Sequence, residues 1–260
     1  MILVKLGGSV ITDKNRRNTV RRKVLNRLSK EIKKAEKEII IVHGAGSFGH
    51  IYAEKYFLNK GYINGKQKKG FAITHQNVRL LNNIVLESLI NAGIPAVSIP
   101  PISFVKLKNK KLHHCEESWF KDSLNLGLTP VTFGDVVFDT KLGFNICSGD
   151  LLMVALSAKF KPERAVFVID EEGIYSANPK LEKTAKLLKN LSVEELTKVT
   201  TPSNTHADVT GGMMGKIESI KEIAAIGVEV WVVNGNKRDR IYRALTGKKT
   251  KSTIIKGVET

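Results

Sequence analysis

Short runs of apolar and β-branched residues alternate with helical segments along almost the whole chain, and this alternation is the feature that most limits its possible folds. Residues 2–6 and 39–42 are two such runs. Between them, residues 23–37 place apolar side chains at helical spacing behind a basic outer face. Helices that connect parallel strands cover both faces of the sheet. The sequence therefore predicts an α/β fold in which helices sandwich a mainly parallel, open sheet.

The pattern continues to the C-terminus without an internal repeat, a linker or a low-complexity segment. A single domain of residues 1–260 is therefore expected, with a boundary between two lobes near residue 160. A polar excursion at 106–114 predicts one small β-hairpin, and the runs 136–139 and 143–147 predict a second. Further helices are expected at 78–91, 119–126, 151–158, 215–225 and 239–245, and further strands at 96–99, 129–133, 165–169 and 229–233, with an edge strand near 253–255.

The formal net charge of +17 raises the question of a nucleic-acid partner, because lysine and arginine neutralise phosphates. Only 7% of the residues are aromatic, and no RNA- or DNA-binding motif is present. The basic residues form short groups, at 14–23, 30–37, 106–111 and 248–256, which is typical of solvated helix faces and loop tips. No nucleic-acid partner is expected, although a positive field would steer anionic substrates towards a site.

The sequence predicts neither a membrane span nor a secretory leader. No apolar run approaches the roughly 18 residues that cross a bilayer, so no membrane partner is expected. The N-terminal residues are apolar at once and are predicted to be the first strand, so the protein is expected to start at Met1 and to be cytoplasmic. Cys115 and Cys147 lack redox or metal-binding spacing, and no disulfide is expected.

Four segments at predicted strand ends combine glycine with polar or charged residues. Ligands of open α/β sheets bind beyond the carboxyl ends of the strands. Glycine lets backbone N–H groups approach phosphate oxygens closely, and a following helix adds the positive end of its dipole. The four segments, taken together, predict a phosphate-binding site. They are residues 5–9, 43–50, 148–150 and 208–216.

The glycine spacings disfavour two common nucleotide-binding loops. No segment has the GxxxxGK[ST] spacing of a Walker A loop. Gly44, Gly46 and Gly49 match the GxGxxG spacing of dinucleotide-binding folds. The acidic residue that should follow about twenty positions later is missing, because Asn64 and Gly65 stand there. A dehydrogenase is therefore disfavoured.

Three lysines accompany the glycine segments and fit phosphoryl transfer, which requires positioning and cations around the transferred group. Lys5 lies in the first predicted strand, Lys14 follows the Gly-Gly turn, and Lys216 begins a predicted helix. Lysine inside an apolar strand is costly unless it is paired. Lys5 is therefore the strongest of the three candidates.

Five motifs follow one another over nearly the whole chain: VKLGGS at 4–9, VHGAGSFGH at 42–50, GDVV and SGD at 134–150, DEEGIY at 170–175 and DVTGGMMGK at 208–216. This series resembles the amino acid kinase superfamily. The HGAGSFGH segment is similar in particular to the isopentenyl phosphate kinase branch and to a related kinase that phosphorylates fosfomycin. The resemblance implies the amino acid kinase fold and ATP-dependent phosphorylation of isopentenyl phosphate to isopentenyl diphosphate in isoprenoid biosynthesis.

The resemblance also assigns the acceptor to an N-terminal lobe, about 1–160, and the nucleotide to a C-terminal lobe, about 161–260. The implied catalytic residues are Lys5, Lys14, His50, Asp150 and Lys216. The implied ATP-binding residues are Lys5, Leu6, Gly7, Gly8, Ser9, Gly46, Asp170, Tyr175, Lys180, Gly211 and Lys216. The implied acceptor-binding residues are Ala45, Gly49, His50 and Gly149.

Within this set, Lys5 and Lys14 would stabilise the transferred phosphoryl group, and Asp150 would orient the lysines. His50 would hold the acceptor phosphate, since an imidazole beside a phosphate dianion is readily protonated. The expected cofactors are ATP and Mg²⁺ carried by the nucleotide, without metal ligands on the protein. A homodimer is the expected assembly.

One position departs from the pattern of the family. Glu172 stands where the family often has a second aspartate, which leaves its contact open.

The apolar tail of the acceptor would need a pocket, for which Phe71, Ile73 and residues 78–84 are candidates. His43, inside a predicted strand end, is expected to pack rather than to bind a ligand.

Two alternatives remain open at this point. One is a kinase of another small acid or monophosphate, such as fosfomycin, a nucleoside monophosphate, a carbamate or an acyl carboxylate. The other is a basic RNA-binding or regulatory protein on the same fold. Intact lysines and His50 argue against the second alternative, as does the lack of RNA-binding motifs.

Overall fold

The computed structural model describes residues 1–199 and 212–258. Eight strands form one sheet, and within these residues every neighbouring pair is parallel except β11 and β12. This confirms the predicted α/β fold with a mainly parallel sheet. In their order across the sheet the strands are β10 (Asn190–Leu191), β12 (Ser252–Ile255), β11 (Glu229–Asn234), β9 (Arg164–Ile169), β1 (Ile2–Leu6), β2 (Ile39–His43), β6 (Thr129–Phe133) and β3 (Ala96–Ser98).

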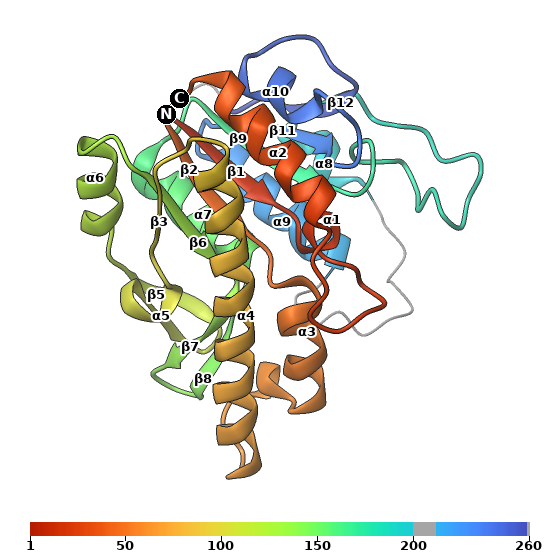
Figure 1. Ribbon diagram of the computed structural model, residues 1–260. Coiled ribbons are helices and arrows are strands. Elements are labelled where there is room, and N and C mark those ends of the chain that lie inside the picture. The colour runs from red at the N-terminus through yellow and green to blue at the C-terminus, as the bar shows by residue number, and fades with distance from the viewer. Residues whose placement is uncertain (200–211, 259–260) are drawn as a thin grey trace.

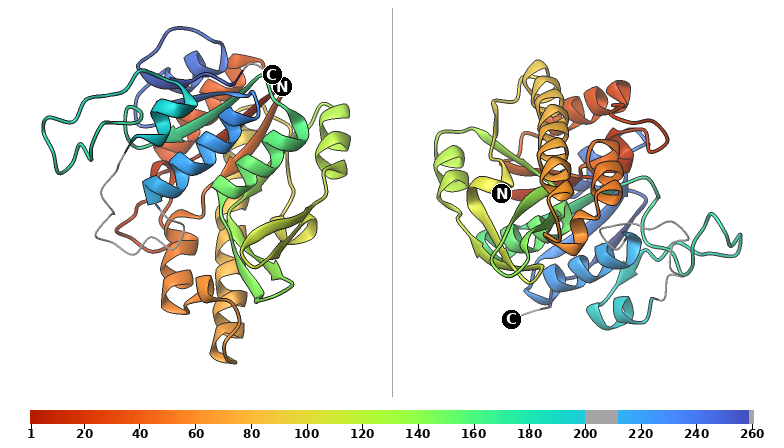
Figure 2. Two further views of the ribbon diagram at one scale, coloured as in Figure 1. Left: turned by 180° about the vertical axis from the view of Figure 1, so that it is seen from behind. Right: turned by 90° about the horizontal axis from the view of Figure 1, so that it is seen from below.

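Helices cover both faces of this sheet, and each face has its own hydrophobic core (Figures 1 and 2). One core contains side chains of α2, α4 and α10, and the other contains side chains of α7 and α9. The helices are α1 (Gly8–Ile11), α2 (Arg22–Ala35), α3 (Gly46–Lys55), η1 (Leu58–Lys60), α4 (Lys66–Asn91), α5 (Pro101–Phe104), α6 (Ser118–Asn125), α7 (Gly149–Phe160), α8 (Val193–Thr197), α9 (Gly212–Ala225) and α10 (Arg240–Leu245).

The central strand β1 is buried along its whole length, and its side chains alternate between the two cores. Leu3 belongs to the core of α7 and α9, whereas Ile2 and Val4 belong to the core of α2, α4 and α10. This is the burial expected for a parallel strand covered on both faces. A polar side chain in such a strand therefore needs a partner, which matters for Lys5.

A second, smaller sheet lies beside the lower part of α4 (Figure 1). It consists of the two predicted hairpins, and its order is β5-β4-β7-β8. An apolar cluster from α3, α4 and this sheet includes Ala53, Phe71, Val136 and Phe144. The strands are β4 (Val105–Lys108), β5 (Lys111–Cys115), β7 (Asp135–Asp139) and β8 (Gly143–Cys147).

Two predictions about elements are wrong. The strand near 253–255 is not at the edge of the sheet, because the two-residue strand β10 pairs with β12 on its outer side. The helix predicted at 78–91 begins at Lys66, twelve residues earlier. Its first turns carry four polar residues and Gly70, which obscure the apolar stripe in the sequence, although Gly70 packs against Tyr56.

No helix in the described part of the chain is both long enough and apolar enough to cross a membrane.

Candidate active site

Of the four predicted glycine segments, residues 5–9 and 43–50 lie at the ends of the neighbouring strands β1 and β2, whereas residues 148–150 follow β8 of the small sheet and residues 208–211 lie outside the described residues. β9, β1, β2 and β6 are neighbours in the sheet, and their backbone ladders continue one residue beyond the strands. The Gly7 amide donates to the Val168 carbonyl at 2.9 Å, and the Gly44 amide donates to the Leu6 carbonyl at 2.9 Å. The parallel topology thus places segments that are far apart in sequence along one edge, as expected for a ligand site.

The first two glycine segments touch through their backbones. A Cβ atom on Gly8 would lie 2.5 Å from the Gly46 nitrogen, and a Cβ atom on Gly44 would lie 2.6 Å from the Gly8 nitrogen. Gly46 also has φ +50°, a left-handed conformation that favours glycine. Only glycine permits this approach, and the approach gathers N–H groups at the start of α1 and α3.

Thr12 fastens these two segments to each other. Its buried hydroxyl donates to the Gly8 carbonyl at 2.7 Å and accepts from the Ser47 amide at 3.1 Å. Thr12 was not among the predicted residues, because nothing local marks a threonine four residues after a glycine as a bridge to a segment 35 residues away. It holds the shape of the glycine cradle, by which we mean Gly7, Gly8 and residues 44–46.

Lys5, Asp150 and Lys216 meet behind this cradle. Lys5 Nζ lies 2.5 Å from Asp150 Oδ1, and Lys216 Nζ lies 3.4 Å from both carboxylate oxygens of Asp150. The three residues come from β1, the first turn of α7 and the second turn of α9, which lie side by side. The pairing that Lys5 was predicted to need is therefore present, and Asp150 supplies it.

The burial of this group shifts its pKa values. Desolvation lowers the pKa of Lys5 to about 8, although Asp150 opposes the shift. Desolvation would raise the pKa of Asp150, but Lys5 and Lys216 outweigh it and hold the pKa at about 2. Asp150 is therefore a permanent anion that keeps two ammonium groups together at the end of the sheet.

A second carboxylate, Asp170, gathers polar groups directly after the carboxyl end of β9. Its Oδ1 accepts from the Ser9 hydroxyl at 3.0 Å, and its Oδ2 lies 3.1 Å from Lys14 Nζ. Lys180 approaches Asp170 at 3.8 Å and Glu171 at 2.9 Å. Burial acts to raise the pKa of Asp170, but Lys14 and its other partners prevail and lower it.

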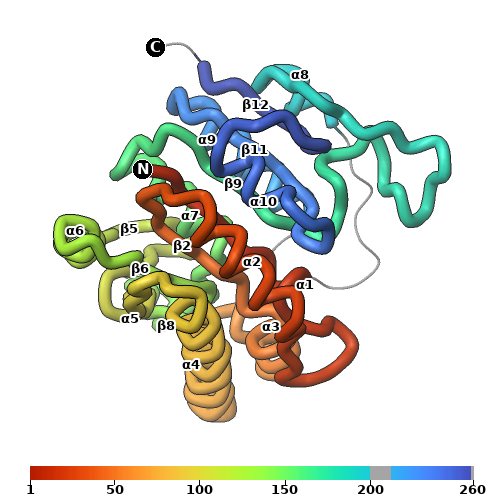
Figure 3. The backbone as a smooth tube through the Cα atoms, turned by 45° about the horizontal axis from the view of Figure 1, so that its top comes forward, coloured from red at the N-terminus to blue at the C-terminus, as the bar shows by residue number. Residues whose placement is uncertain are grey.

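Lys180 stands on an excursion between β9 and β10 that protrudes from the body of the molecule (Figures 1 and 3). Tyr175 forms an isolated bridge with Leu187 at its base, and the ion pairs of Lys180 tie it back to the sheet. Glu172, whose contact the sequence left open, faces Arg240 of α10 at 3.5 Å. The structure therefore brings Lys180 to Asp170, whereas Tyr175 lies at the base of the excursion and Glu172 lies against Arg240.

The predicted acceptor residues lie at the starts of α3 and α7. Ala45 precedes α3, and Gly49 and the half-buried His50 lie in its first turns. Gly149 begins α7 and packs against Lys5, since a Cβ atom there would lie 3.1 Å from Lys5 Cε. Leu6 is buried in β1. The predicted residue Gly211 lies outside the described residues.

His43 is a packing residue, as expected. It is fully buried, its ring stacks on Phe133 with centroids 5.3 Å apart, and Asn82 lies 3.2 Å from its Nε2. Burial lowers the pKa of His43 to about 4, so the ring is neutral.

The candidates for an apolar tail pocket divide into two sets. The rings of Phe71 and Phe144 pack together in the apolar cluster between α3, α4 and the small sheet, with their centroids 5.3 Å apart. Leu81 and Ile84 instead pack in the core under the main sheet. These two apolar side chains of residues 78–84 therefore belong to the hydrophobic core rather than to a ligand pocket. Val78 differs from them, because it lies against Gly49.

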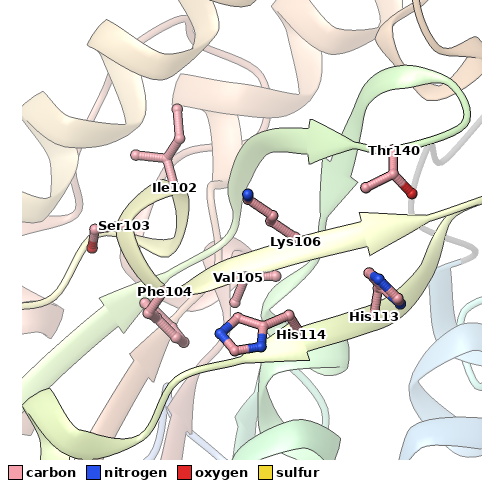
Figure 4. A pocket seen from close by; sticks show the side chains of 8 residues that line it. All are labelled: Ile102, Ser103, Phe104, Val105, Lys106, His113, His114 and Thr140. Carbon is pink, nitrogen blue, oxygen red and sulfur yellow. The ribbon is translucent and has the colours of Figure 1, made fainter.

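A separate pocket of about 520 Å³ lies on α5 and the β4–β5 hairpin (Figure 4). Its eight lining residues include Lys106, His113 and His114, and none of them belongs to the predicted site.

Comparison with known proteins identifies the family of this chain. The family model described as "Amino acid kinase family" matches residues 1–234. Isopentenyl phosphate kinase of Methanothermobacter thermautotrophicus is 39% identical over 266 residues, which cover 99% of this chain and 99% of that relative. A solved structure described as "X-ray structures of isopentenyl phosphate kinase" has a TM-score of 0.87 and 36% identity, covering 98% of this chain and 99% of that one. The "isopentenyl phosphate kinase substrate complex" has a TM-score of 0.82 and 30% identity, covering 98% of this chain and 100% of that one.

Proposed function

The chain belongs to the amino acid kinase family, as its motifs predicted, and we propose that it transfers the γ-phosphoryl group of ATP to isopentenyl phosphate, giving isopentenyl diphosphate and ADP. An oxygen of the acceptor phosphate forms the new bond to the γ-phosphorus, while the bond to the β–γ bridging oxygen breaks and ADP leaves. No covalent intermediate with the protein is required. The relatives with this activity cover nearly the whole chain, which favours it over the other kinases considered.

The observation that carries the proposal is the Lys5–Asp150–Lys216 group beside the glycine cradle. Phosphoryl transfer is accelerated chiefly by fixed cations and N–H groups around the transferred phosphoryl group. Asp150 holds two ammonium groups in place before any ligand arrives, so little reorganisation is needed during the reaction. Lys5 and Lys216 would then stabilise the charge on the transferred phosphoryl group.

On the nucleotide side, residues 5–9 and 46 would surround the ATP phosphates, and Asp170, Tyr175 and Lys180 would line the nucleotide. Lys14 would leave Asp170 and turn towards the γ-phosphate. On the acceptor side, Ala45, Gly49 and Gly149 would approach the monophosphate of the acceptor, and His50 would bind it through a charge-assisted hydrogen bond. The cradle between the two sides is therefore where the phosphates would meet, with the acceptor in the N-terminal lobe and the nucleotide in the C-terminal lobe.

Magnesium would enter with the nucleotide. No group of three histidine, cysteine, aspartate or glutamate residues that could hold a metal ion occurs among residues 1–199 and 212–258. The lysine-rich donor set suits phosphate oxygens rather than a cation, so the nucleotide phosphates would carry Mg²⁺ and this ion would neutralise part of their charge.

The proposal is tested with a panel of acceptors and ATP, with ADP release and phosphorylated product as readouts. The panel contains isopentenyl phosphate, fosfomycin, uridine monophosphate, carbamate and N-acetylglutamate. We expect kcat/KM for isopentenyl phosphate to exceed that for every other acceptor by at least tenfold. A faster reaction with another acceptor would replace the proposed substrate, and the absence of any ADP release with all five would contradict the kinase assignment.

The acceptor role of His50 has its own test. A charge-assisted hydrogen bond to phosphate contributes roughly 1.5–3 kcal/mol, so His50→Ala should lower kcat/KM for isopentenyl phosphate by about one to two orders of magnitude. KM for ATP should barely change, and His50→Gln, which keeps a donor, should retain more activity. A selective loss of ATP binding would move His50 to the nucleotide side. The homodimer and the cytoplasmic location stay predictions, and sedimentation velocity measures the first.

A further inference from the structure

A buried carboxylate next to the acceptor side has no role in the site described so far. Asp135 begins β7, and its side chain is fully buried. Its Oδ1 accepts from the Val136 amide at 2.7 Å, and its Oδ2 lies 2.7 Å from Nδ1 of His75 on α4. Burial raises the pKa of Asp135, and the hydrogen bond with His75 opposes that shift. A carboxylate is rarely buried in this way unless a partner compensates for its desolvation, and His75 is that partner.

The place of Asp135 in the fold connects it to the acceptor side of the cradle. Asp135 follows Gly134, where a Cβ atom would lie 3.2 Å from the Gly149 nitrogen and 3.7 Å from the Ala45 nitrogen. Asp135 also pairs with Cys147 across the β7–β8 ladder, two residues before Gly149. Asp135 is therefore a close neighbour, along the chain and across the ladder, of the backbone groups that would approach the acceptor phosphate.

His75 connects the same point to the apolar cluster. It lies one helical turn after Phe71 on α4 and stacks on that ring with centroids 6.3 Å apart. Phe71 in turn contacts Phe138 and Phe144 of the small sheet. Three residues further along α4, Val78 reaches Gly49, the residue before His50. His75 thus stands where the polar cradle ends and the apolar cluster begins.

The hydrogen bond to Asp135 leaves one ring nitrogen of His75 for a ligand. Asp135 accepts the Nδ1–H proton, which fixes the orientation of the ring. Nε2 forms no hydrogen bond with any residue that the structure describes, and the side chain keeps 20% of its surface exposed. With Nδ1 engaged by Asp135, Nε2 is the ring atom of His75 that can form a hydrogen bond with a ligand.

We propose that His75, oriented by Asp135, is a specificity-determining residue of the acceptor site, which binds the monophosphate end of the acceptor where its apolar part begins. The proposal rests on the proposed function, because it names a second imidazole for the same acceptor. His50 and His75 would then hold the phosphate from α3 and α4, and the aromatic side chains beyond His75 would contact the alkyl group. An acceptor with a polar group directly after the phosphate would meet Phe71 instead of a hydrogen-bonding partner.

The test uses His75→Ala and Asp135→Asn with isopentenyl phosphate and ATP. Loss of one charge-assisted hydrogen bond should raise KM for isopentenyl phosphate by roughly 10- to 100-fold in His75→Ala, with KM for ATP changed less than about twofold. Asp135→Asn should raise the same KM, and adding it to His75→Ala should have little further effect, because the carboxylate acts through the ring. His75→Gln, which keeps an N–H donor, should recover part of the loss.

His114→Ala is the matched control, since His114 is an exposed histidine on β5 opposite Lys106 and outside the site. It should leave both KM values unchanged. An unchanged KM for isopentenyl phosphate in a folded His75→Ala protein would overturn the proposal, and so would an equal rise of both KM values. Should Asp135→Asn fail to fold, the comparison of His75→Ala with His75→Gln decides alone. If the wild-type enzyme prefers another monophosphate, the proposed substrate is wrong, and the same variants measured with that acceptor still test His75.

Discussion

Two groups of the same composition lie on the two sides of the Gly7–Gly8 turn, and they differ chiefly in burial. Each is one aspartate between two lysines: Lys5–Asp150–Lys216, which we call the buried group, and Lys14–Asp170–Lys180, which we call the open group. The side chains of the buried group are 7%, 12% and 16% exposed, in the order given. Those of the open group are 60%, 25% and 64% exposed.

Burial changes what the same three charges can do. In the buried group the low local dielectric strengthens each interaction, shifts the pKa values and fixes the geometry. In the open group water and salt screen the charges, so the pairs contribute little stability and exchange easily. We infer that the buried group is the fixed part of the catalytic machinery and that the open group is the part that rearranges around the nucleotide.

The largest expected difference is in stability. Asp150→Asn leaves two buried ammonium groups without an anion, and breaking a buried ion pair in this way costs about 3–5 kcal/mol. Asp170→Asn should cost at most about 1 kcal/mol, since its lysines are exposed. Urea unfolding of both variants and the wild type at pH 7 measures the two values. Equal losses in the two variants would contradict the distinction between the groups.

The Asp150 contribution should also depend on pH in a defined direction. Its pKa is lowered from 3.8 to about 2, so the stabilisation is complete above pH 3.8 and is lost as the pH falls towards 2. The difference in unfolding free energy between wild type and Asp150→Asn should therefore shrink over that interval.

The next effect is on the rate. Lys5→Met removes a fixed cation from the transferred phosphoryl group, which should lower kcat by about 10²–10³, or about 3–4 kcal/mol of transition-state stabilisation. Methionine fills the space of the lysine stem, and Asp150 keeps Lys216 as a partner. The fold should therefore survive. Single-turnover kinetics, with circular dichroism as a control for folding, give the value. A folded Lys5→Met enzyme with wild-type turnover would remove Lys5 from the mechanism.

The pH dependence separates the catalytic contribution of Lys5 from its effect on stability. Because the pKa of Lys5 is lowered to about 8, kcat/KM for ATP should fall above pH 8 as the free enzyme loses this proton. Asp150→Asn removes the charge that raises this pKa, so the alkaline limb should move to lower pH. Between pH 8 and 10.5 the unfolded chain binds the proton more tightly, and the stability of the wild type relative to Lys5→Met should rise. A rise of activity over the same interval would contradict the role of Lys5 as a cation.

The fold and the pairing of the buried Lys5 could be predicted from the sequence, because both follow from local patterns of apolar and polar residues. A lysine in the apolar run of residues 2–6 has to be paired, and the alternation of elements fixes a parallel sheet whose strand ends carry the site. The strand 129–133 was predicted with the boundaries that the structure has. The family resemblance added Asp150, which no local signal connects to Lys5 across 145 positions.

Contacts between segments that are distant in sequence could not be predicted in this way. Thr12 and Ser47 meet only because β1 and β2 are neighbours, and His75 meets Asp135 only because the small sheet packs on α4. The edge prediction for 253–255 failed for a related reason, since a two-residue strand is too short to leave a periodic signal. The residues of the open group were likewise predicted separately, and only the structure shows that Lys14 pairs with Asp170.

The smallest expected effect concerns Lys14, the exposed lysine of the open group that corresponds to Lys5 in the buried group. In the proposed mechanism Lys14 would have to leave Asp170 to reach the γ-phosphate, and the lost ion pair would offset part of what it gains there. Lys14→Met should therefore lower kcat by roughly tenfold, equivalent to about 1.4 kcal/mol, with a stability change below about 0.5 kcal/mol.

The dependence on salt concentration distinguishes the loss of turnover in Lys14→Met from that in Lys5→Met. At 1 M ionic strength the screening length is only about 3 Å, so an exposed lysine contributes less, and the ratio of wild-type to Lys14→Met turnover should shrink. The corresponding ratio for Lys5→Met should hardly change, because its surroundings exclude water and ions. Turnover of the three enzymes at 0.05 M and 1 M salt, with Mg²⁺ and ATP saturating, makes the comparison. If both ratios respond equally to salt, Lys14 becomes as enclosed as Lys5 once the nucleotide is bound, and the open group closes over the phosphates during the reaction.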